Sequence, residues 1–126
     1  MTEWTSDELA KIEKADELNL SSLRRDGSYR NPVIMWVVRV DDDLYVRCVN
    51  GRKGAWFRGT QTRHEGQIRA GGVVKDVSFM EDSDPAVNEK INDAYRTKYR
   101  RYAASIINSV ISTDARSATI KLVPRA

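Results

Sequence analysis

Hydrophobic residues near the start of the chain have the spacing of a helix. Residues 5–8 (Thr-Ser-Asp-Glu) match a capping box, with Thr5 as the N-cap and Glu8 three positions later. Leu9 and Ile12 follow at helical spacing. We therefore expect a first helix that begins after Thr5 and lies on the outside of a sheet.

The pattern then changes to that of strands. Residues 18–23 alternate between apolar and polar side chains, which predicts a strand. Asp26 and Gly27 mark a hairpin turn between two apolar segments. The unbroken apolar run 33–38 predicts a return strand that is covered on both faces, either by a helix or by a partner chain. Another strand is expected over 44–49.

The second half of the chain mixes both patterns. Residues 54–63 have the pattern of a short helix, although Gly59 in its interior costs about 1 kcal/mol relative to Ala. Gly71 and Gly72 suit a tight turn between two strands. Strands are expected over 66–70, 73–80 and 118–123, with a long helix from residue 85 and a short one near residues 106–110.

These elements favour an α+β fold. Six short strands linked mainly by hairpins predict a mostly antiparallel sheet that curls into a barrel with peripheral helices. A chain of 126 residues with 40% hydrophobic and 31% charged residues fits a single globular domain over 1–126. The start of the chain lacks the basic and apolar segments of a signal peptide, and the sequence contains no membrane-spanning apolar run, so a cytoplasmic protein is expected.

One cysteine and one histidine limit the available chemistry. They cannot form an internal disulfide or a zinc site built from His and Cys ligands, and we expect no metal. Cys48 shares a strand face with Val46, which indicates a small buried hydrophobic residue. His64 lies where a helix is expected to end, a position that favours a cation without any catalytic role.

The strongest functional signal is a basic loop. Residues 47–64 carry five Lys and Arg side chains and no carboxylate. Within this segment the loop Asn-Gly-Arg-Lys-Gly at 50–54 leads into a helix. Glycine amides, a helix N-terminus and two full positive charges together suit a phosphate group. The alternative interpretation is a solvated basic loop with no ligand.

Aromatic residues accompany both basic segments. Trp56 lies two residues after the basic loop. There it could either stack against the planar ring of a ligand or pack in the core. A second segment, 95–102, interleaves tyrosines with Lys and Arg. That mixture can bind nucleic acid, but three tyrosines on one side of a helix more often pack inward. The net charge of +3 is modest for a protein that binds nucleic acid through its phosphates.

Three segments, YVRCVNG at 45–51, GAWFRG at 54–59 and QIRAGG at 67–72, resemble a bacterial family of uncharacterised small proteins. That family looks like a branch of the flavin- and deazaflavin-binding split β-barrels, with the deazaflavin-dependent nitroreductase-like proteins as the nearest analogy. The resemblance implies a split barrel and a homodimer that shares cofactor sites. This chain departs from the wider group in having Gly54 where relatives carry Pro, and Arg58-Gly59 where they carry Asn-Leu.

The resemblance implies a small-molecule oxidoreductase that binds flavin mononucleotide or a deazaflavin in a barrel cleft. Arg25, Arg30, Arg52 and Lys53 would hold the cofactor phosphate, and Trp56 would wall the ring. The full set of expected cofactor-binding residues is Arg25, Arg30, Arg47, Asn50, Gly51, Arg52, Lys53, Trp56 and Arg58. No catalytic residue is assigned. The alternatives are a cofactor-free barrel that binds a small anionic metabolite through Arg47 and Arg58, and a nucleic-acid-binding module.

Overall fold

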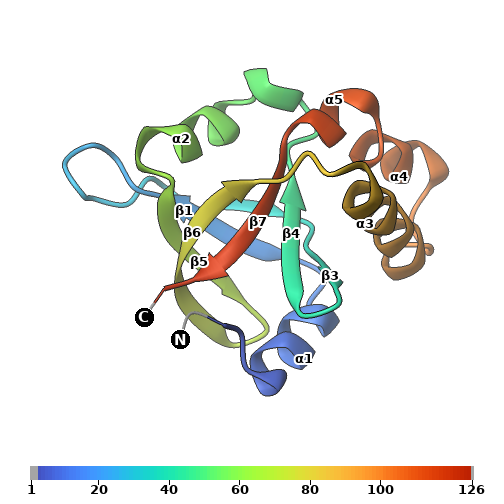
Figure 1. The fold of residues 1–126 in the computed structure, drawn as a ribbon, viewed down its shortest axis with the longest axis horizontal. Helices are drawn as coiled ribbons and strands as arrows, with labels where there is room; N and C mark the ends of the chain where they lie inside the picture. The colour runs from blue at the N-terminus through green and yellow to red at the C-terminus, as the bar shows by residue number, and fades with distance from the viewer. Residues whose placement is uncertain (1–2, 126) are drawn as a thin grey trace.

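The computed structural model describes residues 3–125, in which seven short strands form one antiparallel sheet (Figure 1). Every strand pairing in the sheet is antiparallel. The strands follow one another across the sheet in the order β2-β1-β5-β6-β7-β4-β3. Their bounds are β1 Leu18–Ser22, β2 Val33–Met35, β3 Val38–Val40, β4 Asp43–Arg47, β5 Glu65–Ala70, β6 Val73–Glu81 and β7 Thr119–Pro124.

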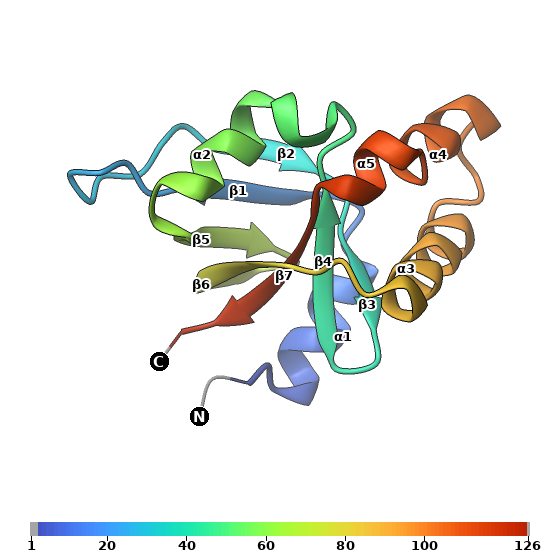
Figure 2. The same ribbon diagram turned by 45° about the horizontal axis from the view of Figure 1, so that its top comes forward.

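The helices lie around the sheet rather than in a separate layer (Figure 2). They are α1 Ser6–Lys14, the short 3-10 helix η1 Gly51–Lys53, α2 Ala55–Arg63, α3 Pro85–Lys98, α4 Ala104–Val110 and α5 Thr113–Ser117. Helix α3 packs against β3, and η1 packs against α5. Helix α2 covers the side of the sheet that carries β1 and β2 (Figure 2).

Local sequence signals explain where several elements begin and end. The capping box is present, because the Thr5 hydroxyl accepts a bond from the Glu8 amide and the Glu8 carboxylate accepts one from the Thr5 amide. Gly71 and Gly72 both have positive φ, as a primed hairpin turn requires. His64 ends α2 in the left-handed conformation, which supports its structural role at a helix C-terminus.

The single strand expected over 33–38 is wrong, since the structure divides this run into β2 and β3 at opposite edges of the sheet. The chain leaves β2 at Trp36 and Val37, where side chains from the C-terminal end of α3 and its cap replace the sheet bonds. The Tyr99 hydroxyl accepts a bond from the Val37 amide at 3.2 Å, and Lys98 Nζ donates to the Val37 carbonyl at 2.7 Å. These bonds satisfy the backbone of Val37 without a neighbouring strand.

This division explains the curl of the sheet and the count of seven strands instead of six. Two residues link the two edge strands. Three Cα–Cα steps separate Met35 from Val38, so those Cα atoms lie within about 11 Å of each other. Edges this close require a strongly curled sheet, and the structure is a half-barrel.

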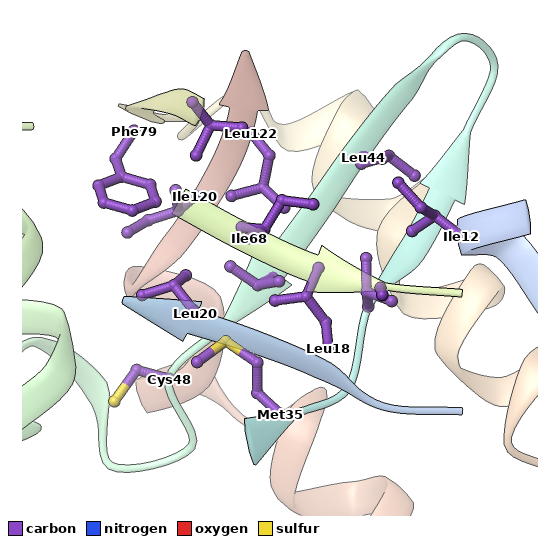
Figure 3. Packing of buried hydrophobic residues seen from close by; sticks show 14 of the residues in the cluster. Ile12, Leu18, Leu20, Met35, Leu44, Cys48, Ile68, Phe79, Ile120 and Leu122 are labelled. Atoms are coloured by element: carbon purple, nitrogen blue, oxygen red, sulfur yellow. The ribbon is translucent and has the colours of Figure 1, made fainter. Parts of the chain in front are cut away.

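Two hydrophobic cores result from this arrangement. The first fills the inside of the curled sheet and includes Leu18, Leu20, Leu44, Ile68 and Leu122 (Figure 3). The second lies between the outside of β3 and β4 and helices α3 and α4. Strand β4 serves both cores, because its alternate residues face alternate sides.

Candidate functional site

A pocket of about 200 Å³ opens at the edge of the second core. We call it the α4 pocket, because its outer wall is helix α4. Its walls include Ile34, Trp36, Val49, Ile106 and Val110. Arg47 and Tyr95 also line it. The pocket therefore joins β2, the 36–37 link, the end of β4 and helices α3 and α4.

Arg47 is a buried cation that neutral groups hold in place. It is 3% exposed, and its side chain lies on the outer face of β4. All five of its N–H groups donate to the chain. The acceptors are Thr119 Oγ1, Asn92 Oδ1, Asn88 Oδ1 and the carbonyl oxygens of Asn88 and Val110. Burial lowers the pKa of Arg47 to about 10, so it keeps its charge at neutral pH.

Tyr95 lies beside Arg47 in the wall of the same pocket. Its side chain is fully buried, and its hydroxyl has no hydrogen-bond partner within residues 3–125. The Arg47 guanidinium lies 5.8 Å from the centre of the Tyr95 ring. Burial raises the pKa of Tyr95, so the hydroxyl stays protonated and can donate. The hydroxyl has no accessible surface, so it lies behind the pocket wall and a ligand in the pocket does not reach it.

The rim of the α4 pocket is apolar and open. Ile34 is 60% exposed, Val49 is 46% exposed and Ile106 is 47% exposed. Isolated exposed apolar residues are ordinary, but three around one pocket form a surface suited to a flat or apolar ligand.

The basic loop, residues 50–54, continues directly from the rim, because Asn50 follows Val49. Asn50 and Lys53 are exposed, and Lys53 forms no salt bridge with the part of the chain that the structure describes. Arg52 instead pairs with Glu81 and donates to the Ser117 carbonyl at 3.2 Å. The hydrogen bond to Glu81 raises the pKa of Arg52.

The inner side of the basic loop is occupied by Cys48. This residue is 2% exposed, as its strand position predicted, and burial raises the pKa of its thiol. The Gly51 amide donates to the Cys48 carbonyl at 2.9 Å, and the Gly54 amide donates to the Gly51 carbonyl at 3.1 Å. Both glycine amides of the loop are thus occupied within the chain, so an anion at this loop would depend on side chains more than on these backbone groups.

The structure does not bring the hairpin arginines to the basic loop. Arg25 is exposed near the hairpin tip. Arg30 packs across α2, where its Nη2 donates to Thr62 Oγ1 at 3.3 Å. A Cβ at Gly59 would lie 3.1 Å from Arg30 Nε, which explains the glycine within this helix. Arg30 contacts Gly59 and Thr62, which follow Gly54 by five and eight residues, so about 8–12 Å of helix separates these contacts from the loop.

Trp56 and Arg58 lie on α2, outside the α4 pocket. Trp56 is half-buried and packs against the first core, so it is neither a fully buried anchor nor part of this pocket. Arg58 is exposed. Tyr95 and Tyr99 are both fully buried, which confirms inward packing for the tyrosine stripe. Of the expected residues, Arg47 lines the pocket and the loop residues flank it.

Two further observations concern metal ligands and membrane-spanning helices. Among residues 3–125, no three His, Cys, Asp or Glu side chains are grouped so that they could hold a metal ion. No helix in that range has the length and apolar character needed to cross a membrane.

Solved structures of similar fold include proteins that bind redox cofactors. An F420-H2 dependent reductase matches with a TM-score of 0.60 and 11% identity, over 86% of this chain and 93% of that one. The heme storage protein HutZ of Vibrio cholerae matches with a TM-score of 0.61 and 12% identity, over 96% and 90%. A FAD-binding protein of Mesorhizobium loti matches with a TM-score of 0.58 and 15% identity, over 98% and 91%. The expected likeness to flavin- and deazaflavin-binding proteins is confirmed at the level of the fold.

Comparison of the sequence itself, rather than the fold, identifies one protein family. No curated protein matches the sequence. A family model matches residues 8–122, and the chain therefore belongs to the family described as "Uncharacterized protein conserved in bacteria (DUF2255)".

Proposed function

We propose that this protein is an oxidoreductase-like protein that binds a flavin or deazaflavin cofactor at the α4 pocket and the basic loop. The observation that carries the proposal is the direct junction of an apolar pocket rim with exposed basic side chains, at Val49 and Asn50. A flavin-type cofactor also combines a planar ring with a phosphate. The ring would lie on the rim, and Lys53 would meet the phosphate.

The residues present fit such a cofactor in part. The exposed side chains of Ile34, Val49 and Ile106 suit a planar ring. Lys53 supplies an exposed cation, whereas Arg52 is engaged with Glu81. We therefore assign the phosphate to Lys53 and Asn50 first, with Arg52 available only if its pair with Glu81 opens.

The cofactor and the chain would contribute different parts of the reaction. The cofactor, when bound, supplies hydride-transfer chemistry. The chain supplies the apolar surface that orients the ring and the positive charge of Arg47 below it. A fixed positive charge near a ring that gains electrons stabilises the reduced form, because the charge does not need to reorganise.

Titration with flavin mononucleotide and with a deazaflavin, followed by fluorescence quenching, tests the proposal. Lys53→Ala should weaken binding of the phosphorylated cofactor several-fold, and Arg25→Ala is the matched control, since it also removes one exposed positive charge, from the hairpin. If neither cofactor binds, or if Arg25→Ala weakens binding as much as Lys53→Ala does, the proposed site is wrong.

A cofactor-free protein that binds a small anionic molecule is the second candidate. The buried charge of Arg47, which no carboxylate of residues 3–125 neutralises at salt-bridge distance, favours it. The same titration separates the two candidates, because the second requires no binding of flavin or deazaflavin.

We further propose a homodimer in which a second copy covers the outer side of β2. This strand is a sheet edge of three residues, and Val33 and Ile34 on it are exposed. An apolar sheet edge is usually protected, and a second copy would provide that protection. Light scattering should give about twice the 14.3 kDa chain mass, and Val33→Lys, at a residue outside the α4 pocket, should return the mass to that of one chain.

A further inference from the structure

A second pocket, of about 400 Å³, lies on the outer face of the sheet over β1 and β5, and the connection between β1 and β2 forms its remaining wall. We call it the outer pocket. It shares no lining residue with the α4 pocket or the basic loop. We propose that the outer pocket binds a small hydroxylated molecule that carries one carboxylate, such as a hexuronic acid. This site is independent of the cofactor proposed above.

The register of β1 and β5 places four polar side chains together in the outer pocket. Asn19 pairs with Arg69, and Ser21 pairs with Gln67. Leu20, between the two polar residues of β1, points into the first core. Neighbouring side chains of a strand point to opposite faces, so both polar pairs point outward. All four of these residues line the pocket.

These side chains are accessible to a ligand and have unused hydrogen-bonding groups. Asn19 and Ser21 are half-buried, and Arg69 is exposed. Within residues 3–125 none of these three side chains forms a hydrogen bond or a salt bridge. Amide and hydroxyl groups both donate and accept hydrogen bonds, as the hydroxyl groups of a sugar do. The pocket therefore offers matched partners for a hydroxylated ring.

Arg69 supplies the charge that a carboxylate requires. A guanidinium binds a carboxylate through two parallel N–H···O bonds. Arg30 also lines the pocket, but its guanidinium donates to Thr62 on α2 at 3.3 Å. Asp76 pairs with Gln67 across β5 and β6, so a negative charge lies beside the far end of the pocket. One cation near one carboxylate favours a singly charged ligand over a phosphate ester, which carries nearly two charges.

Tyr29 gives the outer pocket an aromatic wall. Its hydroxyl donates to Asp76 Oδ1 on β6 at 2.9 Å, and β5 separates β6 from β1, so the side chain extends over β5. Tyr29 is 44% exposed, which leaves ring surface for the apolar C–H groups of a sugar. Residues 67 and 69 lie about 6.6 Å apart along β5. This span is similar to that between the carboxylate of a hexuronic acid and the hydroxyl groups across its ring.

Matched sugars test the inference on the whole protein. Glucuronate and galacturonate are compared with glucose and galactose, which have the same rings without the carboxylate, by isothermal titration calorimetry. Each acid should bind about tenfold more tightly than its neutral sugar, and glucose 6-phosphate should bind more weakly than glucuronate. The side-chain amide NMR signals of Asn19 and Gln67 should shift as glucuronate is added, because both residues line the pocket.

Variants locate the carboxylate. Arg69→Gln should weaken glucuronate binding about tenfold and leave glucose binding nearly unchanged. Arg100→Gln is the matched control, since it removes one exposed arginine charge outside the pocket. Far-ultraviolet circular dichroism confirms that both variants are folded. The inference would be overturned if neither acid binds, if acids and neutral sugars bind equally, if glucose 6-phosphate binds more tightly than glucuronate, or if folded Arg69→Gln binds glucuronate like the wild type.

Discussion

Removal of one hydroxyl group from Tyr99 should open the point where the two edges of the sheet are joined. Tyr99 is fully buried, and its ring stacks on Trp36 with the ring centres 3.9 Å apart. Its hydroxyl donates to the Asp16 carbonyl at 2.6 Å and accepts from the Val37 amide at 3.2 Å. Tyr99→Phe keeps the ring and its stacking but removes both of these bonds.

The cost follows from what each partner loses. The Val37 amide is buried and has no strand neighbour to replace the hydroxyl, so it carries a desolvation cost of about 1–3 kcal/mol. Asp16 is exposed, and water can replace its lost bond at little cost. We expect a total loss of about 2 kcal/mol in the free energy of unfolding. For a chain of 126 residues this corresponds to a fall in melting temperature of about 8 °C.

Urea denaturation followed by tryptophan fluorescence measures the loss, and Tyr102→Phe is the matched control. Within residues 3–125 the Tyr102 hydroxyl accepts one bond, from Arg101 at 3.2 Å and near the surface, so its removal should change stability by less than about 0.5 kcal/mol. If Tyr99→Phe behaves like this control, then the Val37 amide finds another partner and Tyr99 does not hold the sheet edges together.

Three other variants or treatments probe the surroundings of the site. Gly54→Ala should lose about 1–3 kcal/mol of stability, because its Cβ would lie 2.2 Å from Cys48 Sγ, and a double-mutant cycle with Cys48→Ala should recover a large part of the loss. Cys48 should resist iodoacetamide in the native protein and react after denaturation, and rapid native labelling would contradict its burial. Burial lowers the pKa of Lys98 to about 8 from 10.5, so the unfolded chain binds more protons between these values and stability should rise with pH there. The stability advantage of the wild type over Lys98→Met should therefore grow from about pH 7 to about pH 9.5, and a decline measured by urea denaturation would contradict this sign.

Local signals predicted the elements well because most elements are specified by neighbouring residues. The capping box at Thr5, the glycine pair at the β5–β6 turn and the alternation of β4 each act within a few positions. The division of 33–38 could not be seen in this way. It depends on Lys98 and Tyr99, which are about sixty positions away and satisfy the Val37 backbone in place of a strand.

The site was predicted less well for a related reason. In the sequence, Arg47 looks like the basic residues that follow it up to residue 64, because none of them has a carboxylate nearby to indicate a buried ion pair. Its actual partners are two asparagines of α3, Asn88 and Asn92, which the chain brings to it from another element. A signal was available: these asparagines lie one helical turn apart on the same side as Ile91 and Tyr95, and polar residues in an apolar stripe usually have a buried partner.

The link at Trp36 and Val37 also sets limits on how the length of this chain can vary. A connection on the protein surface usually tolerates inserted residues. Here an added residue would push apart two strands that the rest of the sheet holds close, or would turn Met35 out of the first core. The connection between β1 and β2 carries no such constraint, because it projects away from the sheet (Figure 1). An engineered epitope or fluorescent label therefore belongs at the hairpin, and homologous chains should differ in length there while keeping the 36–37 link at two residues.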